Sequence, residues 1–131
     1  MNAMKILLID DSATMREITR SVLVQLDDAE VVEARDGEEG LGLAESIGPD
    51  LVVVDDLMPG MDGLSFLRAF RKCNGSTPVI VIGSDNGRQH VVEAIKAGAS
   101  NYLAKPYTPD LLSQRVQETM SAGPMRAASS R

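Results

Sequence analysis

The stretch Leu51-Val52-Val53-Val54-Asp55-Asp56 decides the fold of this chain. Four consecutive apolar residues, three of them β-branched, are typical of a strand that is covered on both faces, as in a parallel sheet between two layers of helices. The run stops at two carboxylates. We therefore expect a buried central strand whose carboxyl end carries polar side chains.

Other short runs of strand type lie on both sides of this one in the chain. With the central run they cover residues 5–9, 31–34, 51–54, 79–82 and 101–104. Between the strands the apolar residues follow the helical period. The expected helices carry the stripes Met15, Ile18, Val22 and Leu26; Leu64, Leu67 and Phe70; Val91, Ala94 and Ile95; Leu112, Val116 and Met120; and a weaker one around Leu41 and Ala44.

Capping residues support these helices. Asp36 stands three residues before Glu39, as in a capping box, Thr108-Pro109 is a typical helix start, and Gly98 a typical helix end. Strict alternation with short connections predicts an α/β fold: one doubly wound (βα)5 domain of flavodoxin-like type, with a five-stranded parallel sheet, over residues 4–120. Residues 121–131 are small and polar, and we expect a flexible tail or the start of a linker.

Composition narrows the class of protein. A chain of 131 residues with 44% hydrophobic and 24% charged residues is typical of one globular domain. Its net charge of −6 disfavours nucleic acid and anionic membranes as partners. The one cysteine, Cys73, cannot form an internal disulfide, and no apolar run approaches the ~20 residues of a membrane span, so we expect a cytoplasmic protein.

Charged residues gather at the strand tips, where ligands bind to parallel sheets. The tips carry Asp10-Asp11, Asp55-Asp56, Gly83-Ser84 and Lys105-Pro106. Clustered carboxylates repel one another unless a cation binds, and oxygen ligands without a Cys/His cluster favour Mg²⁺ over zinc. A lysine beside them suits phosphoryl transfer. Each aspartate alone could be a helix N-cap, but the joint pattern favours a site.

With these motifs the chain resembles a response-regulator receiver domain, most of all the single-domain chemotaxis type. The resemblance spans about residues 4–120. It rests on Leu8-Ile9-Asp10-Asp11-Ser12 with Thr14-Met15-Arg16, on Val53-Val54-Asp55 followed by Met58-Pro59-Gly60-Met61-Asp62-Gly63, on Ala97-Gly98-Ala99 and on Tyr102-Leu103-Ala104-Lys105-Pro106.

The resemblance implies a phosphoacceptor in a two-component signalling pathway. Asp55 would take a phosphoryl group from a sensor histidine kinase or phosphotransfer protein. Mg²⁺ would be held by Asp11, Asp55 and the backbone carbonyl of Leu57, and Asp10 would assist through water. Lys105 would pair with Asp55 and then with the phosphoryl oxygens, and would precede a cis proline bond. Such a chain is no enzyme, since it assists only its own phosphorylation and dephosphorylation.

Asp56 competes with Asp55 as the acceptor. Neighbouring residues of a strand point to opposite faces, so one of the two should face the site. The run Met58-Pro59-Gly60-Met61-Asp62-Gly63 places Asp55 at the family's acceptor position. Asp56 would then lie on the rim, where its charge would discourage anionic donors or tune dephosphorylation.

The chain departs from the family at Gly83, where the family has Ser or Thr. There that hydroxyl bonds the phosphoryl group and lets a switch aromatic, matched here by Tyr102, rotate inward. The hydroxyl of Ser84 stands one residue later in the chain, and the conformational freedom of Gly83 could bring it to the position of the family's hydroxyl. Tyr102 as this switch competes with Tyr102 as an ordinary half-buried strand residue. His90 reads as a surface residue at a helix start.

Three functions remain open. In the leading one, phosphorylation switches a protein-binding face formed by the fourth helix, fifth strand and fifth helix for an unknown downstream protein. Output would run through protein contacts, unless the chain is a fragment cut from a longer regulator near Ser121. The second is a degenerate receiver that binds its partner without phosphorylation. The third, a flavin binder or small phosphatase, lacks both a phosphate-cradling glycine loop and a flavin-sandwiching aromatic pair.

Overall fold

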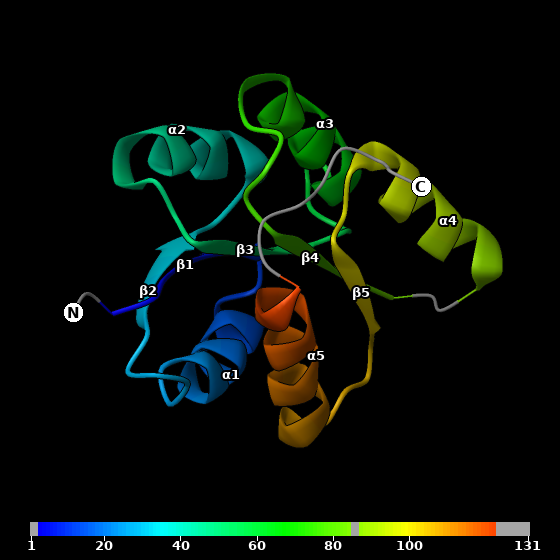
Figure 1. The fold of residues 1–131 in the computed structure, drawn as a ribbon. Coiled ribbons are helices and arrows are strands. Elements are labelled where there is room, and N and C mark those ends of the chain that lie inside the picture. Colours follow the sequence, from blue (N-terminus) through cyan, green and yellow to red (C-terminus); the bar gives the residue numbers. More distant parts are fainter. Residues whose placement is uncertain (1–2, 85–86, 123–131) are drawn as a thin grey trace.

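The computed structural model of the chain describes residues 3–84 and 87–122, and shows strands alternating with helices (Figure 1). The strands are β1 (Lys5–Ile9), β2 (Glu30–Ala34), β3 (Leu51–Asp55), β4 (Val79–Gly83) and β5 (Asn101–Ala104). The helices are α1 (Ala13–Leu23), α2 (Gly37–Ile47), α3 (Gly63–Cys73), α4 (Arg88–Ala97) and α5 (Pro109–Ser121). The strand and helix order predicted from the sequence is confirmed.

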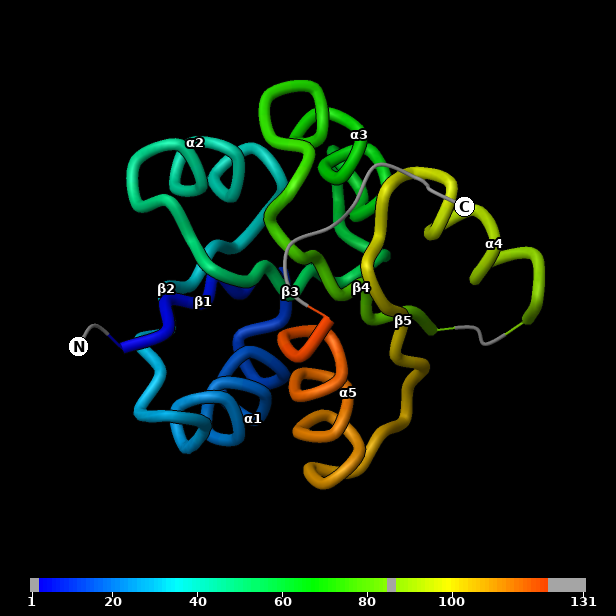
Figure 2. The backbone as a smooth tube through the Cα atoms, in the orientation of Figure 1, coloured from blue at the N-terminus to red at the C-terminus, as the bar shows by residue number. Residues whose placement is uncertain are grey.

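The strands form one parallel sheet in the order β2-β1-β3-β4-β5. Helices α1 and α5 cover one face, and α2, α3 and α4 cover the other (Figures 1 and 2). This is the doubly wound α/β architecture expected from the sequence. The strand order reverses between β1 and β3, so the connections after these strands run to opposite faces of the sheet, which is where ligands bind in folds of this kind. Asp10 and Asp55 stand at the carboxyl ends of these two strands.

Two apolar cores lie on opposite faces of the sheet. Phe66 and Phe70 of α3 dominate the core under α2, α3 and α4, where their rings stack with centroids 5.6 Å apart. Leu23 of α1 and Leu112 of α5 fill the other core. All residues of β3 and β4 are buried, because both faces of these central strands are covered.

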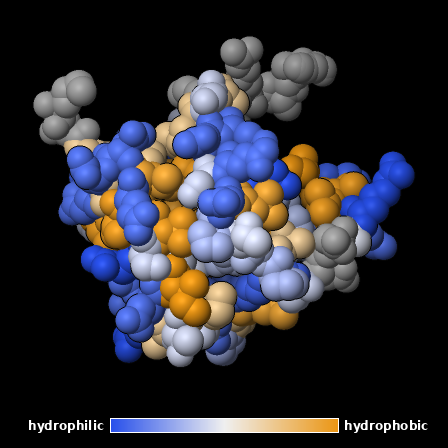
Figure 3. Space-filling view, turned by 90° about the horizontal axis from the view of Figure 1, so that it is seen from below, coloured by the Kyte–Doolittle hydropathy of each residue, from blue (hydrophilic) through white to orange (hydrophobic). Residues whose placement is uncertain are grey.

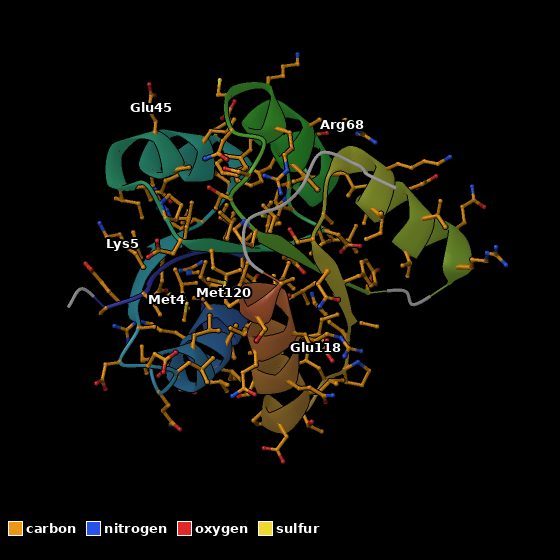
Figure 4. The ribbon with its side chains drawn as sticks, in the orientation of Figure 1. Met4, Lys5, Glu45, Arg68, Glu118 and Met120 are labelled. Atoms are coloured by element: carbon orange, nitrogen blue, oxygen red, sulfur yellow. The ribbon has the colours of Figure 1, made fainter. Side chains whose placement is uncertain are left out.

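The outer surface of the α1 and α5 layer is seen from below in Figure 3. Hydrophilic and hydrophobic residues are interspersed on it. Met4, before β1, and Met120, near the end of α5, pack against the core of this layer and line the same hollow at the amino end of β1 (Figure 4). Residues near both ends of the described chain therefore lie beside the amino end of β1, away from the strand tips.

The predicted apolar stripe of α1 is confirmed at Val22 and Leu26, which pack against the core, but not at Ile18. Ile18 is 49% exposed, whereas Thr19 and Leu23 are buried. Thr19 can face inward because its hydroxyl forms a 2.6 Å hydrogen bond with the hydroxyl of Tyr107, which satisfies a polar group in the core. Ile95 of α4, also predicted to be inward, is 48% exposed. Hydrophobicity alone could not identify a hydrogen-bonded threonine as the buried residue.

The predicted helix caps are confirmed. Asp36 accepts a hydrogen bond from the backbone of Glu39, whose carboxylate in turn accepts one from the backbone of Arg35. Thr108 caps α5, and Gly98 ends α4. Helix α5 includes Ser121; the predicted tail beyond it, at residues 123–131, lies outside the described residues. In the described part of the chain, no helix is long and apolar enough to cross a membrane.

Candidate functional site

Asp10 directly follows β1, and hydrogen bonds of its backbone groups hold it in place. Its N–H donates to the carbonyl of Ala34 (3.1 Å), and its carboxylate accepts a hydrogen bond from the backbone N–H of Ser12 (2.9 Å). The guanidinium of Arg16 donates to its carbonyl (2.7 Å). The side chain is only 5% exposed. The bond from Ser12 orients the Asp10 carboxylate, and the other two hold its backbone.

Asp55 is the last residue of β3 and is 4% exposed. Leu51 and Val53 face the α1 and α5 core, and Asp55 continues that alternation. The Lys105 ammonium lies 2.6 Å from Oδ1 of Asp55. Lys105 is held in turn by its backbone N–H, which donates to the carbonyl of Gly83 (2.8 Å), and it precedes a cis bond to Pro106, as expected. The structure thus joins the tips of β3, β4 and β5.

Asp11 completes an acidic cluster with these residues. One carboxylate oxygen from each of Asp10, Asp11 and Asp55 lies within 4.8 Å of the other two. Asp10 and Asp55 are buried and Asp11 is exposed, so the cluster opens toward solvent through Asp11. Three carboxylates against one lysine leave an excess of negative charge, and the donors are all oxygens. The group could therefore hold a hard divalent cation.

Burial dominates the electrostatics of the cluster. It raises the pKa of Asp10 and that of Asp55, and repulsion by neighbouring carboxylates adds to the rise, while Lys105 opposes it. Burial lowers the pKa of Lys105, but its hydrogen bond to Asp55 and the charges of Asp55 and Asp10 raise it overall. Lys105 therefore stays charged. The ionised forms of Asp10 and Asp55 are destabilised, and a bound cation would relieve this.

The comparisons agree with this geometry. The family model of the response regulator receiver domain matches residues 6–117. The chain belongs to the response-regulator receiver family. It is 34% identical to the chemotaxis protein CheY homolog of Campylobacter jejuni, over 92% of this chain and 95% of that protein. It is 40% identical to the nitrate/nitrite response regulator protein NarL of Escherichia coli, over 92% of this chain but 56% of that protein.

A solved structure gives the same result for the fold. The chemotaxis protein CheY4 of Vibrio cholerae superimposes with a TM-score of 0.82 at 30% identity, covering 91% of this chain and all of that chain. The resemblance predicted from the sequence, including its chemotaxis type, is therefore confirmed.

Asp56 lies apart from the cluster in this receiver. Its backbone N–H donates to the carbonyl of Ile82 (2.9 Å), which ties it to the end of β4. Burial raises the pKa of its carboxyl, and Lys105, the backbone of Ser84 and His90 lower it. His90 is an exposed residue in the first turn of α4. Asp56 thus faces the β4–α4 side, and Asp55 alone of the pair contacts Lys105.

The space beside Gly83 is filled by a side chain of the neighbouring strand β5. A Cβ on Gly83 would overlap the hydroxyl of Tyr102 and lie 2.9 Å from its Cε1 atom. Tyr102 pairs with Val81, two residues before Gly83, so Tyr102 and residue 83 share one face of the sheet. Ser84 is exposed just after the strand. The sequence identified Gly83 and Tyr102 as exceptional residues but not their contact, although strand pairing could have suggested it.

Two residues that support the site could not be recognised as such from the sequence. Arg16 holds the Asp10 carbonyl and is itself held by Glu33 of β2 (3.1 Å). Gly63, the first residue of α3, packs directly on the backbone of Asp55 and Asp56. Both residues belong to the motifs that carry the family resemblance, but a motif does not show which atoms each residue contacts. Leu57, the expected source of a carbonyl ligand, is 61% exposed in the β3–α3 connection.

We expect Asp10→Asn to stabilise the domain at neutral pH in the absence of a divalent cation. The folded-state pKa of Asp10 lies above its ordinary value of 3.8, so stability is highest below that value and falls as the pH rises through the folded-state pKa. Asparagine keeps the acceptor for Ser12 and removes the charge. The thermal midpoint in chelator at pH 7 should rise, by a few degrees for a gain of roughly 1 kcal/mol.

The matched control is Asp11→Asn, because Asp11 belongs to the same cluster but is exposed. Its effect in chelator should be smaller. A lower midpoint for Asp10→Asn than for the unchanged protein would contradict the assignment of a buried, repelled carboxylate.

Proposed function

We propose that this receiver takes a phosphoryl group onto Asp55 from a sensor histidine kinase or a phosphotransfer protein, with Mg²⁺ at the acidic cluster, in the cytoplasm. The observation that carries the proposal is the buried Asp55 carboxylate, held 2.6 Å from the Lys105 ammonium beside the oxygens of Asp10 and Asp11. A fixed nucleophile with adjacent positive charge is what phosphoryl transfer requires, because catalysis there is mostly positioning and electrostatics.

Each residue of the site has its own part in the chemistry. A carboxylate oxygen of Asp55 attacks the phosphorus of a phosphohistidine on the donor protein. The bond between phosphorus and the histidine ring nitrogen breaks, and its electron pair stays on that nitrogen. Lys105 orients the Asp55 carboxylate and then pairs with the phosphoryl oxygens. Asp11, Asp55 and the Leu57 carbonyl would hold Mg²⁺, with Asp10 acting through water. When bound, the ion would neutralise charge on the transferring group.

The output of the domain would be protein binding through α4, β5 and α5. Lys105 lies in the connection between β5 and α5, so a change in what Lys105 contacts acts directly on this face. The chain would catalyse no reaction other than its own phosphorylation and dephosphorylation. A degenerate receiver, which binds its partner without phosphorylation, remains the second candidate, because the Tyr102 hydroxyl already occupies the side-chain position at residue 83.

Mg²⁺ should raise the thermal midpoint of the protein by neutralising the acidic cluster, to an extent set by the ion concentration relative to Kd. Adding fluoroberyllate, which mimics a phosphoryl group on aspartate, should raise it further. Asp11→Ala should remove most of the Mg²⁺ effect because it deletes the exposed ligand. Differential scanning calorimetry in chelator, in millimolar Mg²⁺ and in Mg²⁺ with fluoroberyllate measures these steps.

The control is Glu45→Gln, which removes an exposed carboxylate in the last turn of α2 that points outward (Figure 4) and does not belong to the acidic cluster. It should keep the full Mg²⁺ effect. Equal midpoints in chelator and in Mg²⁺ with fluoroberyllate for the unchanged protein would refute the proposed site.

A further inference from the structure

The contact between Tyr102 and Gly83 bears on how the domain is regulated. We infer that the Tyr102 ring is held inward over Gly83 whether or not Asp55 carries a phosphoryl group, because residue 83 has no side chain to exclude it. The inference deepens the proposed function, on which it rests, since it concerns the response of the domain to phosphorylation of Asp55.

The backbone around Gly83 is tied to both neighbouring strands. The Gly83 carbonyl accepts a hydrogen bond from the backbone N–H of Lys105 (2.8 Å), and the preceding carbonyl, of Ile82, accepts one from Asp56 (2.9 Å). Residues Ile82 and Gly83 also pair with Leu103 and Ala104 of β5. The Cα of residue 83 therefore cannot move away from the ring without breaking sheet hydrogen bonds.

The Tyr102 ring occupies the space directly on that Cα. Its hydroxyl and Cζ atoms overlap the place of a Cβ, and Cε1 lies 2.9 Å from it, closer than real Cβ atoms come to neighbours. The ring also packs against the apolar core under α2, α3 and α4. An alanine at residue 83 would thus be enough to exclude the observed ring position, whereas glycine leaves it permanently open.

Outward rotation of the ring has no compensating contact at residue 83. It would leave a void over Gly83 and take apolar ring surface out of the core. Gly83 has no side chain that would have to move before the ring enters, so the space is open from the start. The β5 part of the proposed binding face therefore keeps one form, and a signal from Asp55 would pass through Lys105 and the β5–α5 connection instead.

The chain allows the ring to be observed alone, because it has two tyrosines and no tryptophan. Tyr107→Phe leaves Tyr102 as the single tyrosine, at the cost of the hydrogen bond to Thr19. Labelling this protein with 3-fluorotyrosine gives one ring resonance in ¹⁹F NMR. We expect the same resonance position in chelator and in Mg²⁺ with fluoroberyllate, and a clear displacement toward that of free 3-fluorotyrosine in the Gly83→Ala variant.

Solvent access to the ring gives a second measurement. Acrylamide quenching of Tyr102 fluorescence should be unchanged by fluoroberyllate and at least doubled by Gly83→Ala. Ser84→Ala, one residue later and exposed, is the matched control and should change neither quantity. The inference is overturned if fluoroberyllate displaces the resonance of the glycine protein, if Gly83→Ala leaves it in place, or if Ser84→Ala displaces it equally.

The ¹⁹F experiment distinguishes a failure of this inference from a failure of the proposed function. Bound fluoroberyllate has its own ¹⁹F resonance, which reports occupancy of the Asp55 site. Occupancy with a displaced ring overturns the inference and supports the proposed function. Without occupancy at millimolar Mg²⁺ the proposed function fails, and the ring position over Gly83 is then decided by Gly83→Ala alone. Should Gly83→Ala fail to fold, the fluoroberyllate comparison on the glycine protein decides.

Discussion

Asp55→Asn abolishes phosphorylation of this receiver by a small-molecule acyl phosphate in Mg²⁺, which is the largest functional effect we expect. The amide is a poor nucleophile, carries no charge to pair with the Lys105 ammonium 2.6 Å away, and is a weak ligand for a hard cation. Intact-mass spectrometry should show the phosphoryl adduct on the unchanged protein and none on Asp55→Asn.

Asp56→Asn is the matched control, since it removes a carboxylate one residue further along the same strand end. Asp56 is tied to the end of β4 and does not contact Lys105, so its variant should still form the adduct. A full adduct on Asp55→Asn, or its loss from Asp56→Asn alone, would reverse the assignment of the acceptor.

Gly63→Ala should cause the largest loss of stability among single-methyl additions at the site. A Cβ at residue 63 would overlap the Asp55 carbonyl oxygen and lie 2.7 Å from the Asp56 Cα, and neither backbone atom can turn aside as a side chain would. Overpacking of this kind costs about 1–3 kcal/mol or more. Urea unfolding measures this loss, and the initial rate of acyl phosphate labelling should fall with it because the Asp55 backbone is displaced.

Gly42→Ala provides the control for this substitution. Gly42 lies inside α2, and nothing stands within 4 Å of its Cβ position. Alanine there should stabilise the domain by roughly 0.5–1 kcal/mol, because glycine is unfavourable in a helix interior. If Gly63→Ala were as stable as the unchanged protein, the close packing of α3 on the end of β3 would be wrong.

Much of this molecule can be predicted from local patterns in the chain. The all-apolar run ending at Asp55 is enough to predict a doubly covered strand, since such a strand needs no polar face. Parallel strands bring their carboxyl ends to one edge, so Asp10, Asp55 and Lys105 could be placed together before any coordinates. Strand alternation, with its period of two residues, predicts that only one of Asp55 and Asp56 faces the site, and the family resemblance indicates that it is Asp55.

Tertiary structure alone decided the contacts on which the site depends. Periodicity could not show that Arg16 holds the Asp10 carbonyl, that Thr19 and not Ile18 faces inward, or that Tyr102 fills the place of a side chain at residue 83. The Thr19 and Tyr102 contacts join segments that lie far apart in the chain, and the Arg16 guanidinium reaches back from α1 to the end of β1. The sequence by itself determined which residues reach the strand tips, since this depends on local period, whereas the space left around each residue depends on what its neighbours across the sheet place there.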